Sequence, residues 1–459
     1  MRNSGRLIDV LDRMEKGPVT SEKEFDLKLV SARTQALVKE YGLKFDGENI
    51  INCDDDMADR CFQAGLTLAA DAGVYCTSNG RRLTWNRREI EETIKYAPEE
   101  MTIGFGRDAI TDAHRFPEDP RPPTNVGGPV GNPLPEDLFL PVMQSYIQEP
   151  LVDAVINGTL GSVYGRVPRA GSPWELLSGW HEAEMSIAAA RRAGREGISI
   201  GCVQTATTDI AELSASSFGG FRQTDFHHVA MISELKTDYR LLNKVAHLIR
   251  TDAIVHSFCN PIYGGLAGGA EGIAVMGVAG MILLQMMYMT TTHSTSPTHP
   301  FYHGCNTTPE ILWGTSLFTQ ALSRNTPFMI VVVTTPVSGP STKTLLYESA
   351  AMALTATVSG ATRIMGPRSA AGTIPGHCTG LEARFAGEVG RAAAGMTREQ
   401  ASELLAKIVP VYKDLLGTDM TGLRFDEVYD LATLKPTPDW LATYDQAKAE
   451  MAKIGVPFA

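Results

Sequence analysis

Apolar residues at helical spacing mark both ends of the chain, and a different pattern fills the middle. In the first hundred residues the helical segments end at glycine turns, and we expect helices at residues 22–40, 54–72 and 86–97. No strand-like run precedes residue 101. After residue 380 the pattern is helical again, and we expect helices at residues 381–394, 398–416 and 438–454.

The middle of the chain repeats an order of short apolar run, glycine-rich loop and helical stretch. The runs predict strands at residues 102–105, 124–126, 154–159, 199–203, 253–258, 300–304, 328–333 and 362–365. The helical stretches lie at residues 174–192, 225–250, 270–289, 309–322 and 344–358. Residues 225–250 have the most regular spacing, because apolar residues recur every three or four positions from Val229 to Ile249.

Strands that alternate with helices predict a parallel sheet, and about eight such units predict closure into a (β/α)8 barrel, the TIM barrel. An open, doubly wound sheet is the alternative. We therefore expect an α/β protein with a helical segment at residues 1–100, the barrel at residues 101–380, and helices packed on the barrel at residues 381–459.

Charge and composition narrow the function. Lys+Arg 41 against Asp+Glu 52 gives a net charge of −11, which disfavours binding to nucleic acid or to an anionic membrane. The apolar run at residues 272–288 is short and interrupted by glycine, so we interpret it as a buried helix. The amino terminus lacks the apolar core of a secretory signal, and seven scattered cysteines form no C-x-x-C pair. We expect a cytoplasmic protein.

In a barrel, functional residues belong at the carboxyl ends of the strands. Gly201 interrupts the strand predicted at residues 199–203, which indicates either close approach of a ligand or simple packing against a helix. The glycine-rich loops at residues 127–133 and 264–269 match no phosphate-binding motif. Phe258 ends a predicted strand, where its ring belongs to the core or faces a cationic ligand.

Histidine and cysteine pairs near the predicted strand ends raise the alternative of a catalytic zinc. These pairs are His256 with Cys259, His303 with Cys305, and His377 with Cys378. No three of them share a recognised spacing, and we predict no bound metal. His227 and His228 open the helix predicted at residues 225–250, so only one can face inward. We expect His227 to be solvated and His228 to face inward.

Long, irregular motifs carry a resemblance to a known family. They include residues 42–48, 106–109, 127–141 and 380–391, and they extend over nearly the whole chain. The sequence resembles the corrinoid-dependent monomethylamine methyltransferases of methylotrophic methanogens. The resemblance implies a TIM barrel, a homo-oligomer that is a hexamer in that family, and a partner protein whose cobalamin docks over the barrel mouth. No cofactor is expected to bind tightly to this chain.

The resemblance also places a site. The position of Gly201 holds pyrrolysine in that family, and Gln204, His228, Phe258 and Val333 stand where the family has glutamates and a glutamine. The pyrrolysine and its polar surroundings are thus replaced together, which favours a changed substrate, as in the pyrrolysine-free glycine betaine methyltransferase of a related family.

We predict that Gly201 leaves room for the substrate, that Gln204 and His228 hydrogen-bond its carboxylate or carbonyl, and that Phe258 and Val333 form a ring face and an apolar wall. Gly201, Gln204 and His228 are the predicted catalytic residues. His256 and Asn260 are also predicted to bind the substrate.

The leading hypothesis is a methyltransferase that moves a methyl group from a small N-methylated compound to cobalt(I) of a corrinoid protein. A quaternary amine would be a suitable methyl donor. A quaternary ammonium already leaves as a neutral amine and needs no covalent activator. Two alternatives stay open: an O- or S-demethylase on the same barrel, assisted by zinc at His303 and Cys305, and a scaffold that holds a corrinoid protein without turnover.

Overall fold

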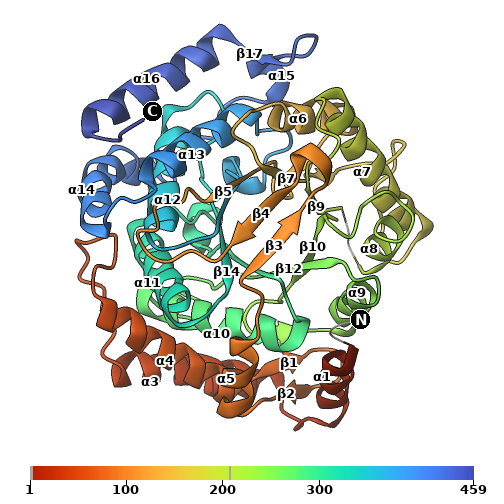
Figure 1. Ribbon diagram of the computed structural model, residues 1–459, viewed down its shortest axis with the longest axis vertical. Coiled ribbons are helices and arrows are strands. Elements are labelled where there is room, and N and C mark those ends of the chain that lie inside the picture. The colour runs from red at the N-terminus through yellow and green to blue at the C-terminus, as the bar shows by residue number, and fades with distance from the viewer. Residues whose placement is uncertain (1–3, 206–207, 459) are drawn as a thin grey trace.

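Eight parallel strands form a closed barrel in the computed structural model, which describes residues 4–205 and 208–458 (Figure 1). Around the barrel the strands follow the order β10, β12, β13, β14, β15, β5, β7 and β9. Their bounds are β5 (Thr124–Gly127), β7 (Ala154–Ile156), β9 (Ile200–Cys202), β10 (Phe226–Ala230), β12 (Ile254–Cys259), β13 (Thr292–Thr295), β14 (Met329–Val333) and β15 (Arg363–Met365). The predicted (β/α)8 barrel is confirmed, and the open sheet is excluded.

Two predicted strands do not belong to the barrel. Residues 102–105 overlap β3 (Glu100–Ile103), which pairs with β4 (Ile110–Ala113) in an antiparallel hairpin. The predicted strand at residues 300–304 is a 3-10 turn, η3 (Pro300–Tyr302), and the barrel strand of this repeat is β13. The sequence of β13, Thr-His-Ser-Thr, is too polar to be recognised as a buried strand.

The helix predicted at residues 225–250 is wrong in its first half. That stretch contains the barrel strand β10, the short strand β11 (Lys236–Thr237) and then the helix α9 (Tyr239–Arg250). The side chain of Asp238 accepts a hydrogen bond from the Leu241 N–H and so caps the first turn of α9. The apolar spacing from Val229 to Ile249 is therefore not one helical pattern. Its first part comes from a strand, and only its second part comes from a helix.

The β3–β4 hairpin closes the amino-terminal end of the barrel, where it lies across the strands in Figure 1. Asp112 of β4 forms an ion pair with Arg363, the first residue of β15, and both side chains are fully buried. Arg363 also lies 5.0 Å from the centre of the Phe226 ring. Above this pair an apolar cluster fills the interior: Ile103, Val126, Ala154, Ile156, Phe226, Val331, Val333 and Met365. The barrel is consequently solid at this end.

Helices surround the barrel. They are α6 (Glu136–Ile147), α7 (Pro173–Arg192), α8 (Ile210–Ala215), α9, α10 (Ala270–Tyr288), α11 (Pro309–Asn325), α12 (Lys343–Val358) and α13 (Gly380–Ala393). Five of these, α7, α10, α11, α12 and α13, lie where helices are predicted, α9 is the second half of a predicted helix, and α6 and α8 are additional. The short strands β6 (Pro133–Leu134) and β8 (Thr159–Leu160) pair outside the barrel.

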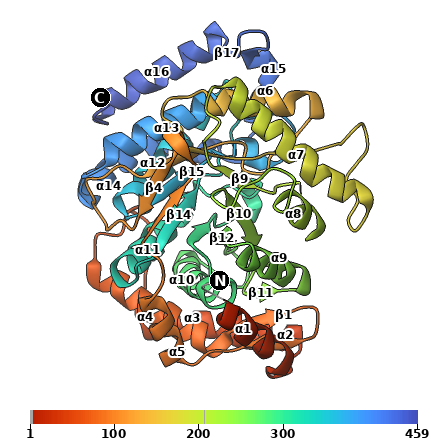
Figure 2. The same cartoon turned by 45° about the vertical axis from the view of Figure 1, so that its right-hand side comes forward.

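The amino-terminal segment covers one side of the barrel, at the bottom of Figures 1 and 2. It comprises α1 (Ser4–Lys16), α2 (Glu22–Glu24), the π-helical η1 (Phe25–Ala32), α3 (Arg33–Glu40), α4 (Asp55–Ala72), β1 (Val74–Cys76), β2 (Arg81–Leu83) and α5 (Arg87–Lys95). The prediction that no strand precedes residue 101 is wrong, because β1 pairs with both β2 and β11.

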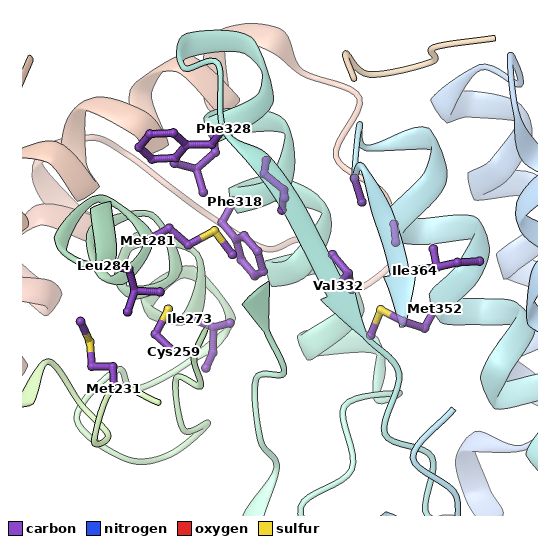
Figure 3. Packing of buried hydrophobic residues seen from close by; sticks show 14 of the residues in the cluster. Met231, Cys259, Ile273, Met281, Leu284, Phe318, Phe328, Val332, Met352 and Ile364 are labelled. Atoms are coloured by element: carbon purple, nitrogen blue, oxygen red, sulfur yellow. The ribbon is translucent and has the colours of Figure 1, made fainter. Parts of the chain in front are cut away.

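Helix α10 is apolar on nearly all sides because other helices and the barrel strands β12 and β13 surround it. Among the helices, it packs against α3, α4, α5 and α11, and Figure 3 shows its residue Met281 close to Phe318 of α11. Of the described helices, α10 is the one long and apolar enough to cross a membrane, but 94% of that window is buried inside the protein. It is the buried helix expected from residues 272–288.

The carboxyl-terminal helices lie on the opposite side, at the top of Figure 2. The main ones are α14 (Arg398–Ile408) and α16 (Pro438–Ile454), which pack against α12 and each other. The helix predicted at residues 398–416 ends at Ile408. Short elements follow it: η5 (Val409–Val411), η6 (Lys413–Leu415), α15 (Phe425–Val428), β16 (Tyr429–Asp430) and β17 (Lys435–Pro436).

Candidate functional site

A cavity of about 290 Å³ lies at the carboxyl-terminal end of the barrel strands. Its wall is formed by the last residues of several strands and by the loops that follow them, which is where barrel enzymes place their chemistry. Six of the seven predicted site residues line this cavity: Gln204, His228, His256, Phe258, Asn260 and Val333.

Gly201 does not line the cavity. It lies on β9 directly opposite Phe226 of β10, and a Cβ atom at this glycine would come within 2.3 Å of Phe226 Cε2. Phe226 is completely buried, so its ring occupies the space that the missing side chain leaves. The prediction that Gly201 leaves room for the substrate is therefore wrong. The glycine instead allows close packing, here against the ring of Phe226.

Aromatic rings of β10 and β12 form one wall of the cavity. His228 and His256 are neighbours in the parallel register, with ring centres 4.7 Å apart, and the Phe258 ring is 5.9 Å from that of His228. Strand alternation explains this grouping, because residues 226, 228 and 230 of β10 and residues 254, 256 and 258 of β12 point into the barrel. The predicted inward orientation of His228 agrees with this arrangement.

Both histidines have a hydrogen-bonding partner at Nδ1, and for His228 this partner determines which ring nitrogen carries the proton. The Gln204 amide donates to His228 Nδ1 over 2.7 Å, so the proton of a neutral His228 ring is on Nε2. That Nε2 is buried and has no hydrogen-bond partner in the described part of the chain. His256 Nδ1 lies 2.7 Å from Thr292 Oγ1.

Both rings are neutral. Burial lowers the pKa of His228 to about 3, with further lowering by the nearby charges of His227, Lys244 and Arg363. Burial likewise lowers the pKa of His256 well below its ordinary value. The cavity wall thus offers neutral aromatic rings.

His227 is not solvated as expected, since only 1% of the residue is exposed. It points out of the barrel toward α8, where its Nδ1 lies 2.8 Å from Glu212 Oε1. Burial lowers the pKa of His227, but the hydrogen bond and charge of Glu212 outweigh burial and raise the pKa above its ordinary value. The error follows from the helix assigned to this segment, because a strand buries both of its faces in a covered barrel.

A buried carboxylate of α7 positions the chain that follows β9. Glu182 accepts hydrogen bonds from the Gln204 N–H (2.9 Å), the Thr205 N–H (2.8 Å) and the Asn157 side-chain amide (2.9 Å). The Gln204 side chain consequently has a fixed base from which to reach His228. The sequence interpretation missed Glu182, because nothing in a helical segment distinguishes a buried glutamate from the usual exposed one.

Arg368 was also missed, although it lines the cavity. It stands three residues after the end of β15, and its Nε donates to the Val130 carbonyl over 3.0 Å. A basic residue just beyond a predicted barrel strand was the available signal. Met365 and Ser294 line the same cavity from the ends of β15 and β13.

A second cavity of about 330 Å³ adjoins the first. Gln204, His228 and Phe258 line both cavities, and Lys244, Asp238 and Arg240 line the second alone. The two cavities therefore meet at the same three side chains.

No cluster of three potential metal ligands occurs among the residues that the structure describes. Cys305 is buried, and burial raises the pKa of its thiol to about 12, so the thiolate that zinc requires is disfavoured. The proposed pair of His303 and Cys305 does not form a metal centre with a third ligand from these residues.

A closed parallel barrel with a small cavity at the carboxyl ends of its strands defines the class of (β/α)8-barrel enzymes. The family model described as "Monomethylamine methyltransferase MtmB" matches residues 6–456. The chain belongs to this family and is a methyltransferase.

Similar proteins cover essentially the whole chain. Monomethylamine methyltransferase MtmB of Methanosarcina mazei is 34% identical over 100% of this chain and 99% of its own length. MtmB2 of Methanosarcina acetivorans is 34% identical over 98% of each chain. The crystal structure of the Methanosarcina barkeri enzyme superposes with a TM-score of 0.96 at 32% identity and covers 98% of each chain.

Proposed function

We propose that this chain transfers a methyl group from a small N-methylated compound, one larger than methylamine, to the cobalt(I) of a partner corrinoid protein. Family membership supports the reaction type. The cavity supports the size of the substrate, because its volume of about 290 Å³ is close to that of ordinary small-molecule binding sites, roughly 300 Å³ and more. Methylamine has only two non-hydrogen atoms and would leave most of this volume to water.

We further propose that the enzyme works without pyrrolysine. The resemblance implies that Gly201 stands at the position of pyrrolysine, and the buried Phe226 ring fills the space beside this glycine. A long side chain at residue 201 would have to displace that ring before it could reach the cavity. The barrel interior beside residue 201 is thus packed in a way that requires glycine at this position.

The chemistry assigns separate tasks to this chain and to its partner. A cavity of this size suits a small ligand and not a corrin ring, so the partner protein brings the cobalt, which supplies the nucleophile. This chain has to hold the substrate with one methyl group directed outward and to exclude water.

The neutral rings of His228, His256 and Phe258 form a wall suited to a methylated, cationic nitrogen. Val333 and Met365 add apolar surface, and Gln204 and Asn260 add hydrogen-bonding groups. No carboxylate of the described residues lines this cavity, so the wall favours a nitrogen without N–H donors, as in a quaternary ammonium.

The other candidates are weaker. A zinc-assisted demethylase needs ligands that do not come together in the described part of the chain. A scaffold without turnover does not fit a member of a methyltransferase family that retains a cavity at the barrel mouth. We also propose that the protein is a homo-oligomer, a hexamer in the resembled family, and acts in the cytoplasm without nucleic-acid or membrane partners.

Reconstitution tests the proposed function. The purified chain is mixed with a reduced corrinoid protein and, one at a time, mono-, di- and trimethylamine and quaternary N-methyl compounds, and the absorbance change from cobalt(I) to methylcobalt(III) is followed. We expect methylation with a quaternary compound. Turnover with methylamine alone would contradict the proposed substrate, and an absence of methylcobalt with every compound would contradict the function.

A further inference from the structure

The cavity wall carries a positive charge, although the proposed substrate contains a positively charged, methylated nitrogen. Among the described residues that line the cavity, Arg368 alone carries a full charge, and that charge is positive. Arg363 lies deeper in the barrel, but Asp112 compensates its charge. A substrate with only a methylated ammonium group would therefore meet a cation with no anion to balance it.

The guanidinium of Arg368 is held in place by neutral groups. Nε donates to the carbonyl of Val130 (3.0 Å), Nη1 to that of Ala371 (3.2 Å) and Nη2 to that of Gly372 (3.3 Å). These bonds use three of its five N–H groups, which leaves one on each Nη atom. No carboxylate of the described residues forms an ion pair with Arg368, and burial lowers its pKa without reversing its charge.

Each of the two free N–H groups, one on either Nη atom, can donate a charge-assisted hydrogen bond to a carboxylate oxygen. We propose that the substrate carries a carboxylate in addition to its methylated nitrogen, and that Arg368 binds this carboxylate. The inference rests on the proposed function, and it narrows the substrate to zwitterionic, betaine-like amino acids.

The order of the strands places the two ends of such a substrate apart. Arg368 follows β15, whereas the ring wall belongs to β10 and β12. In the closed barrel β10 is four positions from β15, which is the opposite side of an eight-stranded circle. A carboxylate at Arg368 thus directs the methylated nitrogen across the cavity toward His228 and Phe258. In this arrangement Arg368 replaces Gln204 and His228 as the group that binds the carboxylate.

Calorimetric titration without corrinoid protein separates this inference from the proposed function. The probes are trimethylammonioacetate, its carbon isostere 3,3-dimethylbutanoate, and 2-hydroxyethyltrimethylammonium, in which a hydroxymethyl group replaces the carboxylate. We expect the wild-type chain to bind the two carboxylates at least tenfold more tightly than the alcohol, because the charge-assisted hydrogen bonds from Arg368 are lost in the alcohol.

Arg368→Met should weaken binding of both carboxylates at least tenfold and leave the affinity for the alcohol within about twofold. Arg368→Lys keeps the charge but not the fork and should lose less. Lys244→Met is the matched control, since Lys244 lines only the adjoining cavity, and it should leave all three affinities within about twofold. Circular dichroism confirms that each variant is folded.

Several outcomes would overturn the inference: equal wild-type affinity for alcohol and carboxylates, no binding of either carboxylate at millimolar concentration, or carboxylate binding that depends on Lys244 and not on Arg368. If Arg368→Met fails to fold, the wild-type comparison and Arg368→Lys decide. Carboxylate binding without any methyl transfer would contradict the proposed function alone, and methyl transfer from the alcohol as fast as from the carboxylate would contradict this inference alone.

Discussion

Gly201 and Phe226 occupy one shared space inside the barrel. A Cβ at residue 201 would lie 2.3 Å from Phe226 Cε2 and 2.6 Å from Cζ, and the ring is enclosed by the barrel. Gly201→Ala should therefore lower the free energy of unfolding by about 1–3 kcal/mol, as overpacking of a full core does. Urea denaturation of the two proteins measures this difference.

A second substitution at the ring tests the cause of that loss. Phe226→Leu shortens the side chain, so the double variant should lose less than the sum of the two single losses. Gly5→Ala is the matched control, because nothing lies within 4 Å of that Cβ in helix α1. Strictly additive losses would contradict the shared space.

His228 makes stability depend on pH. Its folded pKa of about 3 lies below the ordinary value of 6.5, so the unfolded chain binds the extra proton first as the pH falls. The contribution is present above about pH 6.5 and is lost on acidification, by up to about 1.4 kcal/mol per pH unit. His228→Gln should remove this part of the slope between pH 6.5 and 5, as measured by urea denaturation.

The comparison has to be made between variants and not from one curve. Burial raises the pKa of Glu149, Glu234 and Glu382 to about 7 each, and these carboxyl groups stabilise the fold as the pH falls, which opposes His228. They are present in both proteins and cancel in the difference. Equal slopes for wild type and His228→Gln would show that His228 is protonated in the folded chain.

At the scale of single residues, part of the cavity wall could be predicted. Gln204, Phe258, Asn260 and Val333 were found through positions at or after strand ends and through resemblance, and they line the cavity. What the sequence could not reveal is which space is already filled. Whether the space beside Gly201 is empty depends on Phe226, which lies on the neighbouring strand β10. The sequence pattern predicts a helix at Phe226 and so gives no sign of this contact.

At the scale of elements, α7 supports the site through one side chain. Glu182→Gln replaces a carboxylate oxygen by an NH₂ group that would face the N–H of either Thr205 or Gln204. Two opposed donors in a buried place should cost about 1–3 kcal/mol of the free energy of unfolding. The variant should also bind trimethylammonioacetate more weakly, because Gln204 loses its support.

The control for this prediction is on the same helix. Glu184 is 66% exposed at its side chain, and Glu184→Gln should change the unfolding midpoint little. If Glu182→Gln were as stable as wild type, the carboxyl group would be protonated in the folded chain and would already act as a donor.

Elements were predictable where one pattern ran through a whole segment. Strand β14 is apolar throughout and helix α10 is apolar over most of its length, and both agree with the prediction. β13 does not show the pattern of a buried strand, because its four residues are polar although all are buried. Residues 102–105 do show that pattern, but they overlap β3 of the β3–β4 hairpin and not a barrel strand. Pattern alone cannot show that a strand pairs with its own neighbour across the end of a barrel.

At the scale of the whole molecule, the amino-terminal segment covers the apolar helix α10 and shields it from solvent. An added Cβ at Gly65 of α4 would lie 2.4 Å from Val278 of α10, which shows how closely the two helices pack. Arg6 of α1 donates to the Gln285 carbonyl near the end of α10. Without residues 1–99, α10 would present a continuous apolar face to solvent.

Deletion of residues 1–99 should therefore give a chain that aggregates or binds the dye ANS strongly, and co-expression of residues 1–99 as a separate chain should restore soluble protein. Deletion of residues 1–16 is the control, since α4 still covers α10 in that variant, and most of it should remain soluble. Size-exclusion chromatography and ANS fluorescence measure both. A soluble, monodisperse barrel without residues 1–99 and without ANS binding would show that the barrel and α10 are stable alone, and that these helices serve another purpose than covering the core.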